Sequence, residues 1–174
     1  MDVRIQGHAA HRYLQSGVAV IPVPHRRKEP VHKGWQDMCL TQEDVAIYWT
    51  DSQNIGALTG EPSGWRVDVD LDCHEAVVAA ERFLTGTLSS GRAAKEHSHW
   101  WYRAHSIESE SFKDVDGSMI LEIRANGRQT LLPPSVHPSG ESYVWHGAHE
   151  VILPLRSATR VRVGGLSFPG GCVW

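Results

Sequence analysis

The run VDVDLD at residues 67–72 constrains the fold more than any other feature of the chain. Side chains of a β-strand alternate between its faces, so Asp68, Asp70 and Asp72 share one face while the aliphatic residues between them point into a core. The flanking segments are apolar enough to place this strand mid-sheet, where neighbouring carboxylates need positive partners. Two carboxylates at this spacing can bridge two divalent cations about 4 Å apart, the geometry of phosphoryl transfer. A solvated edge face is the alternative, and for Asp72 we favour capping of a helix that begins at residue 74.

Two further segments carry polar side chains on otherwise apolar strands. In ILEIR (120–124), Glu122 and Arg124 share one face. A surface ion pair is the simpler interpretation of that pair alone. If the segment neighbours the strand at 65–71, Glu122 becomes a third metal ligand and Arg124, whose guanidinium matches phosphate oxygens, can meet a phosphate. His99 begins the strand HWWYR, where a packed histidine is the alternative to a functional one.

Length and composition describe one folded domain, residues 1–174. A chain of 174 residues with 41% hydrophobic residues and seven tryptophans can bury a sizeable core, which argues against intrinsic disorder. No apolar run approaches the roughly 18 residues that span a bilayer, and the first residues do not resemble a signal peptide. We therefore expect a cytoplasmic protein with no membrane partner. Three dispersed cysteines without a CxxC pair support neither a disulfide framework nor a structural zinc site.

Charge is distributed unevenly along the chain. The net charge is −3, but residues 1–35 hold six basic and two acidic groups, a net +4, which leaves −7 for the remainder. This net charge excludes a protein that binds nucleic acid through a large overall positive charge. Within the first segment, Arg26, Arg27, Lys28 and Lys33 are candidates for contact with a template strand or a triphosphate. A solvated loop is the alternative.

Periodicity and turn residues predict an α+β fold with two layers around one sheet. Helices are expected over 8–15, closed by Gly17, over 41–49 with Thr41 as N-cap, and over 74–84, where Val77, Val78, Ala80, Phe83 and Leu84 are available for a buried face. A basic loop is expected over 24–35 and a second loop over 85–97, and the tail at 160–174 has weak β character. Strands are expected at 18–23, 54–60, 65–71, 99–103, 118–124, 128–135 and 142–146.

In this order, the segments resemble the bifunctional DNA primase/polymerase (Prim-Pol) domain of the archaeo-eukaryotic primase superfamily. The resemblance covers about residues 9–146 and leaves 147–174 as a C-terminal extension of uncertain structure. It rests on LQSGVAVIPV, RRKEP and KGW, then on NIGALTGEPSGWRVDVDLD, SHWWYR, LEIR and finally NGRQTLLPPSVH. The family's paired acids fall on Asp68 and Asp70, although Asp70 and Asp72 satisfy the same spacing. Its histidine falls on His99, and its single acid on Glu122.

The resemblance implies a template-directed nucleotidyltransferase built on an RRM-like palm. Asp68, Asp70 and Glu122 would hold two Mg²⁺ or Mn²⁺ ions, and His99 would contact the triphosphate. Arg124 and Ser135 would lie near the nucleotide, and Lys95 could replace the phosphate-binding residues that AAKEHS lacks. The implied partners are single-stranded or primed DNA, NTPs or dNTPs and a separate replicative helicase, in plasmid or phage-type replication. A metal-dependent nuclease or phosphohydrolase and an inactive nucleic-acid-binding accessory module are the alternatives.

Overall fold

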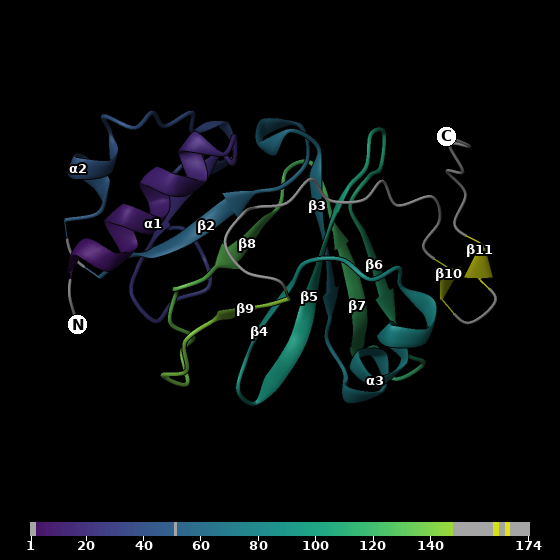
Figure 1. The fold of residues 1–174 in the computed structure, drawn as a ribbon. Helices are drawn as coiled ribbons and strands as arrows, with labels where there is room; N and C mark the ends of the chain where they lie inside the picture. The colour runs from purple at the N-terminus through teal and green to yellow at the C-terminus, as the bar shows by residue number, and fades with distance from the viewer. Residues whose placement is uncertain (1–2, 51, 148–161, 164–165, 168–174) are drawn as a thin grey trace.

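The computed structural model describes residues 3–50, 52–147, 162–163 and 166–167, and it has an α+β fold. Its main sheet is antiparallel, with the strand order β6-β7-β3-β5-β4-β9 (Figure 1). These strands are β3 (Arg66–Leu71), β4 (Ser89–Arg92), β5 (Lys95–Arg103), β6 (Glu110–Lys113), β7 (Met119–Arg124) and β9 (Val144–His146). The central position of β3, with β5 and β7 on either side, confirms that the aspartate-bearing strand lies mid-sheet.

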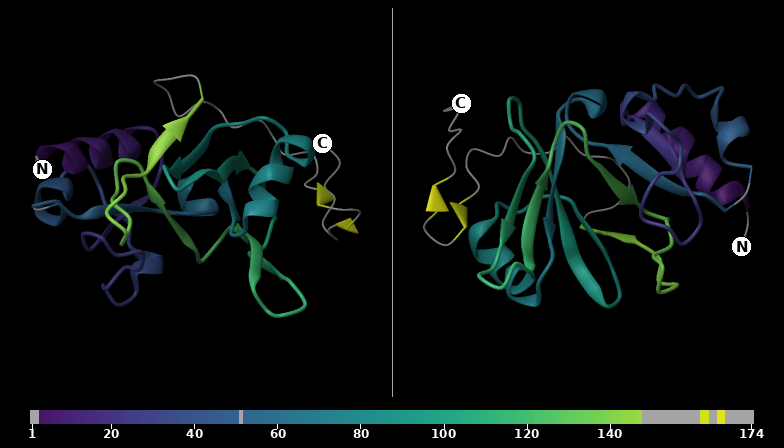
Figure 2. Two further views of the ribbon diagram at one scale, coloured as in Figure 1. Left: turned by 90° about the horizontal axis from the view of Figure 1, so that it is seen from below. Right: turned by 180° about the vertical axis from the view of Figure 1, so that it is seen from behind.

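A second antiparallel sheet has the order β1-β2-β8. Its strands are β1 (Val20–Val23), β2 (Asn54–Leu58) and β8 (Gln129–Leu132). The helices α1 (Val3–Gln15) and α2 (Val45–Tyr48) lie at this end of the molecule, and α3 (His74–Phe83) lies at the other end (Figures 1 and 2). The remaining elements are the 3-10 turns η1 (Trp35–Asp37) and η2 (Glu61–Ser63) and the strand pair β10 (Arg162–Val163) and β11 (Leu166–Ser167).

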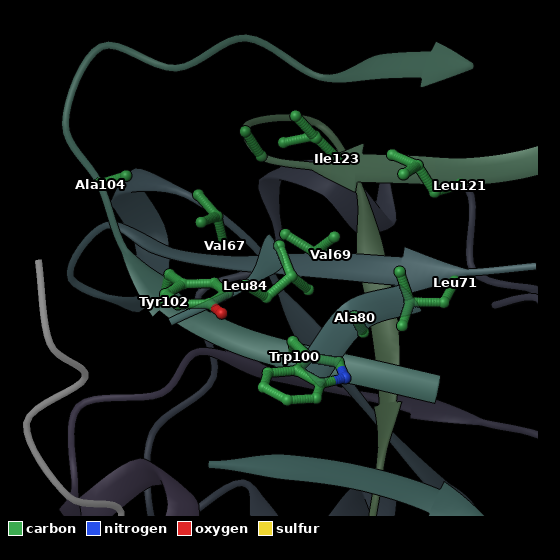
Figure 3. Close-up of a cluster of buried hydrophobic side chains, with 11 residues drawn as sticks. Val67, Val69, Leu71, Ala80, Leu84, Trp100, Tyr102, Ala104, Leu121 and Ile123 are labelled. Carbon is green, nitrogen blue, oxygen red and sulfur yellow. The ribbon is translucent and has the colours of Figure 1, made fainter. Parts of the chain in front are cut away.

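Two hydrophobic clusters pack on opposite faces of β5. Trp101 packs with side chains of α1, α2 and the second sheet, so it joins the two sheets. Trp100 and Tyr102, on the other face, pack with the aliphatic residues of β3 and β7 and with Ala80 of α3 (Figure 3). The aromatic residues of β5 are therefore divided between its two faces, as strand alternation requires. Both faces of β3 are buried as a result, including the face that carries the aspartates.

Gly17 closes α1 as the sequence predicts. Its φ of 75° is left-handed, the amide of Gly17 donates to the Leu14 carbonyl, and the amide of Val18 donates to the Tyr13 carbonyl. This pair of bonds is a Schellman motif, which satisfies carbonyls that the helix end leaves unpaired. The helix begins earlier than expected, at Val3. Because the Schellman motif ends the helix, the chain can turn directly into the buried strand β1.

The second expected helix is shorter than predicted. It covers only Val45–Tyr48, and its N-cap residue is Asp44 rather than Thr41. The Thr41 amide and hydroxyl instead donate to the Asp44 carboxylate, at 2.7 and 2.8 Å, and this forms a separate turn. For α3, the predicted buried face is also partly wrong. Val78 is 61% exposed and Phe83 50% exposed, and the sheet covers mainly Ala80 and Leu84.

The expected loop over 85–97 is wrong, because it contains β4 and the start of β5. Its small polar residues have low strand propensity, but cross-strand bonds hold them: the Trp101 indole donates to Ser90 Oγ at 3.2 Å. A Cβ at Gly91 would lie 2.5 Å from the Lys95 carbonyl, so glycine permits the close approach of the two strands. Strand β6 was not expected either. Most of the tail at 147–174 lies outside the described residues, apart from Gly147 and the pair β10–β11.

None of the described helices is long and apolar enough to cross a membrane.

Candidate active site

The register of three strands gathers polar side chains on one face of the main sheet. Asp68 pairs across β3 and β7 with Arg124, and Asp70 pairs with Glu122. On the other side of β3, Asp70 pairs with His99 of β5. Directly opposite residues of neighbouring strands have their side chains on the same face. The neighbour relation between 65–71 and 120–124, on which the predicted role of Glu122 depends, is therefore confirmed.

Asp68 is fully buried and held by neutral and basic donors. Its Oδ2 accepts a hydrogen bond from the Thr130 hydroxyl at 2.7 Å and lies 3.0 Å from His99 Nδ1. Its Oδ1 is buried without a hydrogen-bond partner. A buried carboxylate oxygen left without a donor is unfavourable unless a cation or proton satisfies it. Asp68 therefore presents one oxygen that is available as a ligand.

Arg124 links the other two carboxylates of the cluster. Its Nη2 lies 2.5 Å from Asp70 Oδ2 and 2.9 Å from Glu122 Oε2. Its Nε also donates to Glu122 Oε2, at 3.1 Å. His99 approaches Asp70 from the other side, with Nδ1 3.3 Å from Oδ1. The acids are thus compensated by two cationic side chains on the same face.

The local charges outweigh burial in setting the ionisation of this cluster. Burial works to raise the pKa of Asp70, but His99 and Arg124 hold that pKa below its ordinary value. Burial likewise works to lower the pKa of His99, but the charges of Asp70 and Asp68 raise it. The pKa of Arg124 is raised for the same reason: burial opposes the shift, but Asp70 and Asp68 outweigh it. The geometry therefore favours anionic Asp70 beside cationic His99 and Arg124.

Asp72 does not cap α3, and that prediction is wrong. The cap is Cys73, whose sulfur accepts from the Ala76 amide at 3.4 Å. The Asp72 carboxylate instead lies 3.7 Å from Lys95 Nζ, which also donates to the Asp72 carbonyl at 2.9 Å. Burial and then the nearby charge of Asp70 raise the pKa of Asp72. Because Cys73 caps the helix, the Asp72 side chain is free to turn toward the cluster.

Three carboxylates converge closely enough to hold a divalent metal ion. Oxygen atoms of Asp70, Asp72 and Glu122 all lie within 4.8 Å of one another. Asp70 is buried and the other two are half-buried. Asp68 is not in this group of three, although it shares a face with Asp70. Carboxylate-only donor sets suit hard cations such as Mg²⁺ or Mn²⁺.

The cluster opens into a cleft with a volume of about 490 Å³. His99, Glu122 and Arg124 line it together with Lys28 of the basic loop and Arg128 of the turn after β7. Of the four basic residues singled out in the loop, Lys28 alone lines this cleft. The Arg26 guanidinium lies against Gly140, and Arg27 and Lys33 are exposed.

Ser135 lies elsewhere. It is fully buried, and its hydroxyl accepts from the Ile55 amide at 2.9 Å and donates to the Ile55 carbonyl at 3.3 Å. This hydroxyl ties the chain after β8 to β2, and Ser135 does not line the cleft. Lys95, in contrast, is brought to the cluster by its contacts with Asp72.

Sequence reasoning missed Thr130. It comes from the second sheet, yet its hydroxyl donates to Asp68. Arg124 Nη1 lies 3.4 Å from the oxygen of this Thr130 hydroxyl. Its signal was a polar residue inside the apolar strand RQTLL, which alternation alone does not connect with Asp68. Thr130 is only 1% exposed. It therefore positions Asp68 rather than facing solvent.

We expect Thr130→Val to lower the free energy of unfolding by about 1–3 kcal/mol, since hydrogen bonds to charged groups contribute that much and the valine leaves Asp68 with one donor fewer. Chemical denaturation measures the loss. Thr130→Ser keeps the hydroxyl and serves as the matched control, with a smaller loss from the missing methyl group. A loss in Thr130→Val no larger than the loss in Thr130→Ser would contradict the prediction, because the hydroxyl would then contribute no more than the methyl group.

The protein is thus an α+β protein with a candidate divalent-metal site. At this site, carboxylates, a histidine and an arginine converge on one face of an antiparallel sheet. The chain belongs to the family of the N-terminal domain of bifunctional DNA primase/polymerases (Prim-Pol), whose family model matches residues 10–159. A comparison with curated proteins finds no match. Membership indicates a nucleotidyltransferase of the primase/polymerase class, whose substrates are DNA and nucleotides.

Proposed function

We propose that this protein is a DNA primase/polymerase that adds nucleotides from NTPs or dNTPs to a 3′-hydroxyl on a DNA template. The observation that carries the proposal is the convergence of Asp70, Glu122, His99 and Arg124 on one face of the main sheet, where the last three line one cleft, in a chain of the Prim-Pol family. The main sheet would serve as an RRM-like palm. We place the whole activity in one domain, residues 1–174, acting in plasmid or phage-type replication with a separate helicase.

The chemistry of the residues supports our proposal of two metal ions. Asp68 contributes a buried oxygen without a donor, and Asp70 and Glu122 contribute converging oxygens. We propose these three as the Mg²⁺ or Mn²⁺ ligands, with Asp72 at the outer edge of the site. Ions bound there would activate the 3′-hydroxyl for attack on the α-phosphorus and neutralise charge on the departing pyrophosphate.

The cationic side chains would bind the triphosphate. His99 directs Nδ1 at the aspartates, which leaves its Nε2 to donate to a phosphate oxygen. Arg124 supplies a planar fork that suits phosphate oxygens, and Lys95 supplies a point charge beside Asp72. The basic loop, with Arg26, Arg27, Lys28 and Lys33, would contact the template strand. Template binding through that loop would weaken steeply as the salt concentration rises.

A primer-extension assay tests the function directly. The full chain is incubated with a labelled primed DNA, dNTPs and Mg²⁺ or Mn²⁺, and the same reaction with chelator is the control. Lengthening of the primer that depends on the metal is the expected result. Shortening would identify a nuclease, and no change together with no divalent binding in calorimetry would identify an accessory module. Single-stranded template with NTPs and dNTPs in separate reactions then reports primer synthesis.

The choice of the aspartate pair can be tested with two matched amides. We expect Asp68→Asn to reduce primer extension more than Asp72→Asn, by about 10-fold or more, because Asp68 is fully buried whereas Asp72 is half-exposed and water can replace its oxygens. Extension rates and Mn²⁺ affinity of the two folded variants measure the difference. A larger loss in Asp72→Asn would move the pair to Asp70 and Asp72.

A further inference from the structure

One wall of the cleft next to the carboxylates contains a residue to which the proposed function assigns no role. Trp35, the first residue of η1, lines it beside Lys28 of the same loop. Trp35 is half-buried, but it belongs to none of the three hydrophobic clusters of the described residues, nor to the side chains packed against them. Core packing therefore does not account for the position of this large apolar ring.

The loop that carries this wall is held by hydrogen bonds to two strands of the second sheet, β2 and β8. The Gln129 side-chain amide donates to the Lys28 carbonyl at 2.7 Å, and the Asn54 side-chain amide donates to the Arg27 carbonyl at 3.1 Å. Gly34, with a left-handed φ of 72°, precedes Trp35 and accepts from the Asp37 amide at 3.0 Å. A fixed wall loses little conformational entropy when a ligand binds.

The chemistry of the cleft matches a ligand that has both an anionic and a planar aromatic part. Lys28, Arg124 and Arg128 supply positive charge, and Trp35 supplies an indole ring. The volume of about 490 Å³ is in the range of small-molecule sites. Indole rings stack on nucleobases without regard to base identity, because every base has a π-face. A nucleotide combines these two parts in one molecule.

We propose that Trp35 is the nucleobase-stacking wall of this cleft. The proposal rests on the proposed nucleotidyltransferase function and adds to it the residue that holds the base while the cationic residues hold the phosphates. The stacked base belongs either to the incoming nucleotide or to the template strand. Both sources have the same chemistry, and separate binding measurements distinguish them.

The test measures binding without turnover, by calorimetry with the full chain in Ca²⁺. The probes are dATP, inorganic tripolyphosphate, an oligo(dT) strand and an abasic strand of equal length. We expect Trp35→Ala to weaken dATP or oligo(dT) binding roughly 5- to 150-fold, the effect of losing one stacked base, and to leave tripolyphosphate and abasic-strand binding within about twofold. A loss for dATP assigns the wall to the incoming base, and a loss for oligo(dT) assigns it to the template.

Three further variants separate stacking from a structural effect. Trp35→Phe should restore most of the affinity because it keeps an aromatic face, whereas Trp35→Leu should behave like Trp35→Ala. Trp65→Ala removes another half-exposed tryptophan, which does not line the cleft, and should bind all four probes like the wild type. Thermal unfolding confirms that each variant is folded.

Two results would overturn the proposal. One is unchanged binding of both dATP and oligo(dT) by a folded Trp35→Ala variant. The other is an equal loss for dATP and tripolyphosphate, which would show that the loop and not the ring was disturbed. A failure of the proposed function is distinguishable, because the wild-type chain would then neither bind dATP nor extend a primer.

Discussion

Asp70→Ala should reduce primer extension by at least about 10²- to 10³-fold while the protein stays folded. Asp70 lies between His99 and Arg124 and shares the converging donor set with Glu122, so its removal would take away a proposed metal ligand. The fold should tolerate the change, because Arg124 keeps its bonds to Glu122 and one buried carboxylate fewer is desolvated. Extension rates, Mn²⁺ titration and thermal unfolding measure the three effects.

Asp116→Ala is the matched control for removal of one carboxylate. Asp116 lies in the exposed turn between β6 and β7, where it accepts from the Ser118 amide and hydroxyl, and it does not line the cleft. Its loss should leave primer extension unchanged. The catalytic assignment fails if a folded Asp68→Ala/Asp70→Ala double variant still extends a primer.

Arg124→Gln should have the largest effect on stability, a loss of about 3–5 kcal/mol in the free energy of unfolding when measured in chelator. Its guanidinium lies against Asp70 and Glu122 and within 4.0 Å of Asp68, and its removal leaves buried carboxylates without that charge. Added Mg²⁺ or Mn²⁺ should recover part of the loss, because ions that bind the folded state stabilise it. Urea denaturation in chelator and in excess Mg²⁺ gives both values.

Arg92→Gln separates this effect from the general loss of an arginine. Arg92 pairs with Glu141 at 2.5 Å, but both side chains are more exposed than those of Arg124 and Asp70, and such pairs contribute about 1 kcal/mol or less. An Arg124→Gln variant as stable in chelator as Arg92→Gln would contradict the prediction. So would a stability of Arg124→Gln that is independent of Mg²⁺.

Alternation along single strands predicted much of the candidate site. The period of two is a local property of the backbone, so it assigned Asp68 and Asp70 to one face and Glu122 and Arg124 to one face without knowledge of the sheet. It could not show that the two strands pair, since β3 and β7 are separated by α3 and three strands in the chain. The pairing became an expectation only through the resemblance to Prim-Pol domains, and the register now confirms it.

The wrong predictions about α3 arose where the local sequence allows more than one arrangement of neighbouring residues. Both Asp72 and Cys73 could cap α3, and the extended backbone of Cys73 places its sulfur over the Ala76 amide. Val78 and Phe83 had the right spacing for a buried face, but the sheet covers only a narrow part of α3. Local propensity ranks such alternatives weakly, and tertiary contacts decide between them.

The sequence by itself determined which side chains can share a face, because that depends on strand periodicity and needs no partner. It also determined the uneven charge, with the basic loop preceding the acidic strands. Only the tertiary structure decided how the acids are compensated: Arg124 bridges Asp70 and Glu122, and Thr130 reaches Asp68 from the second sheet. It also brought Lys28 and Trp35 to the cleft. These contacts join segments far apart in the chain, and their energies depend on burial and distance, which exist only once the two sheets have packed together.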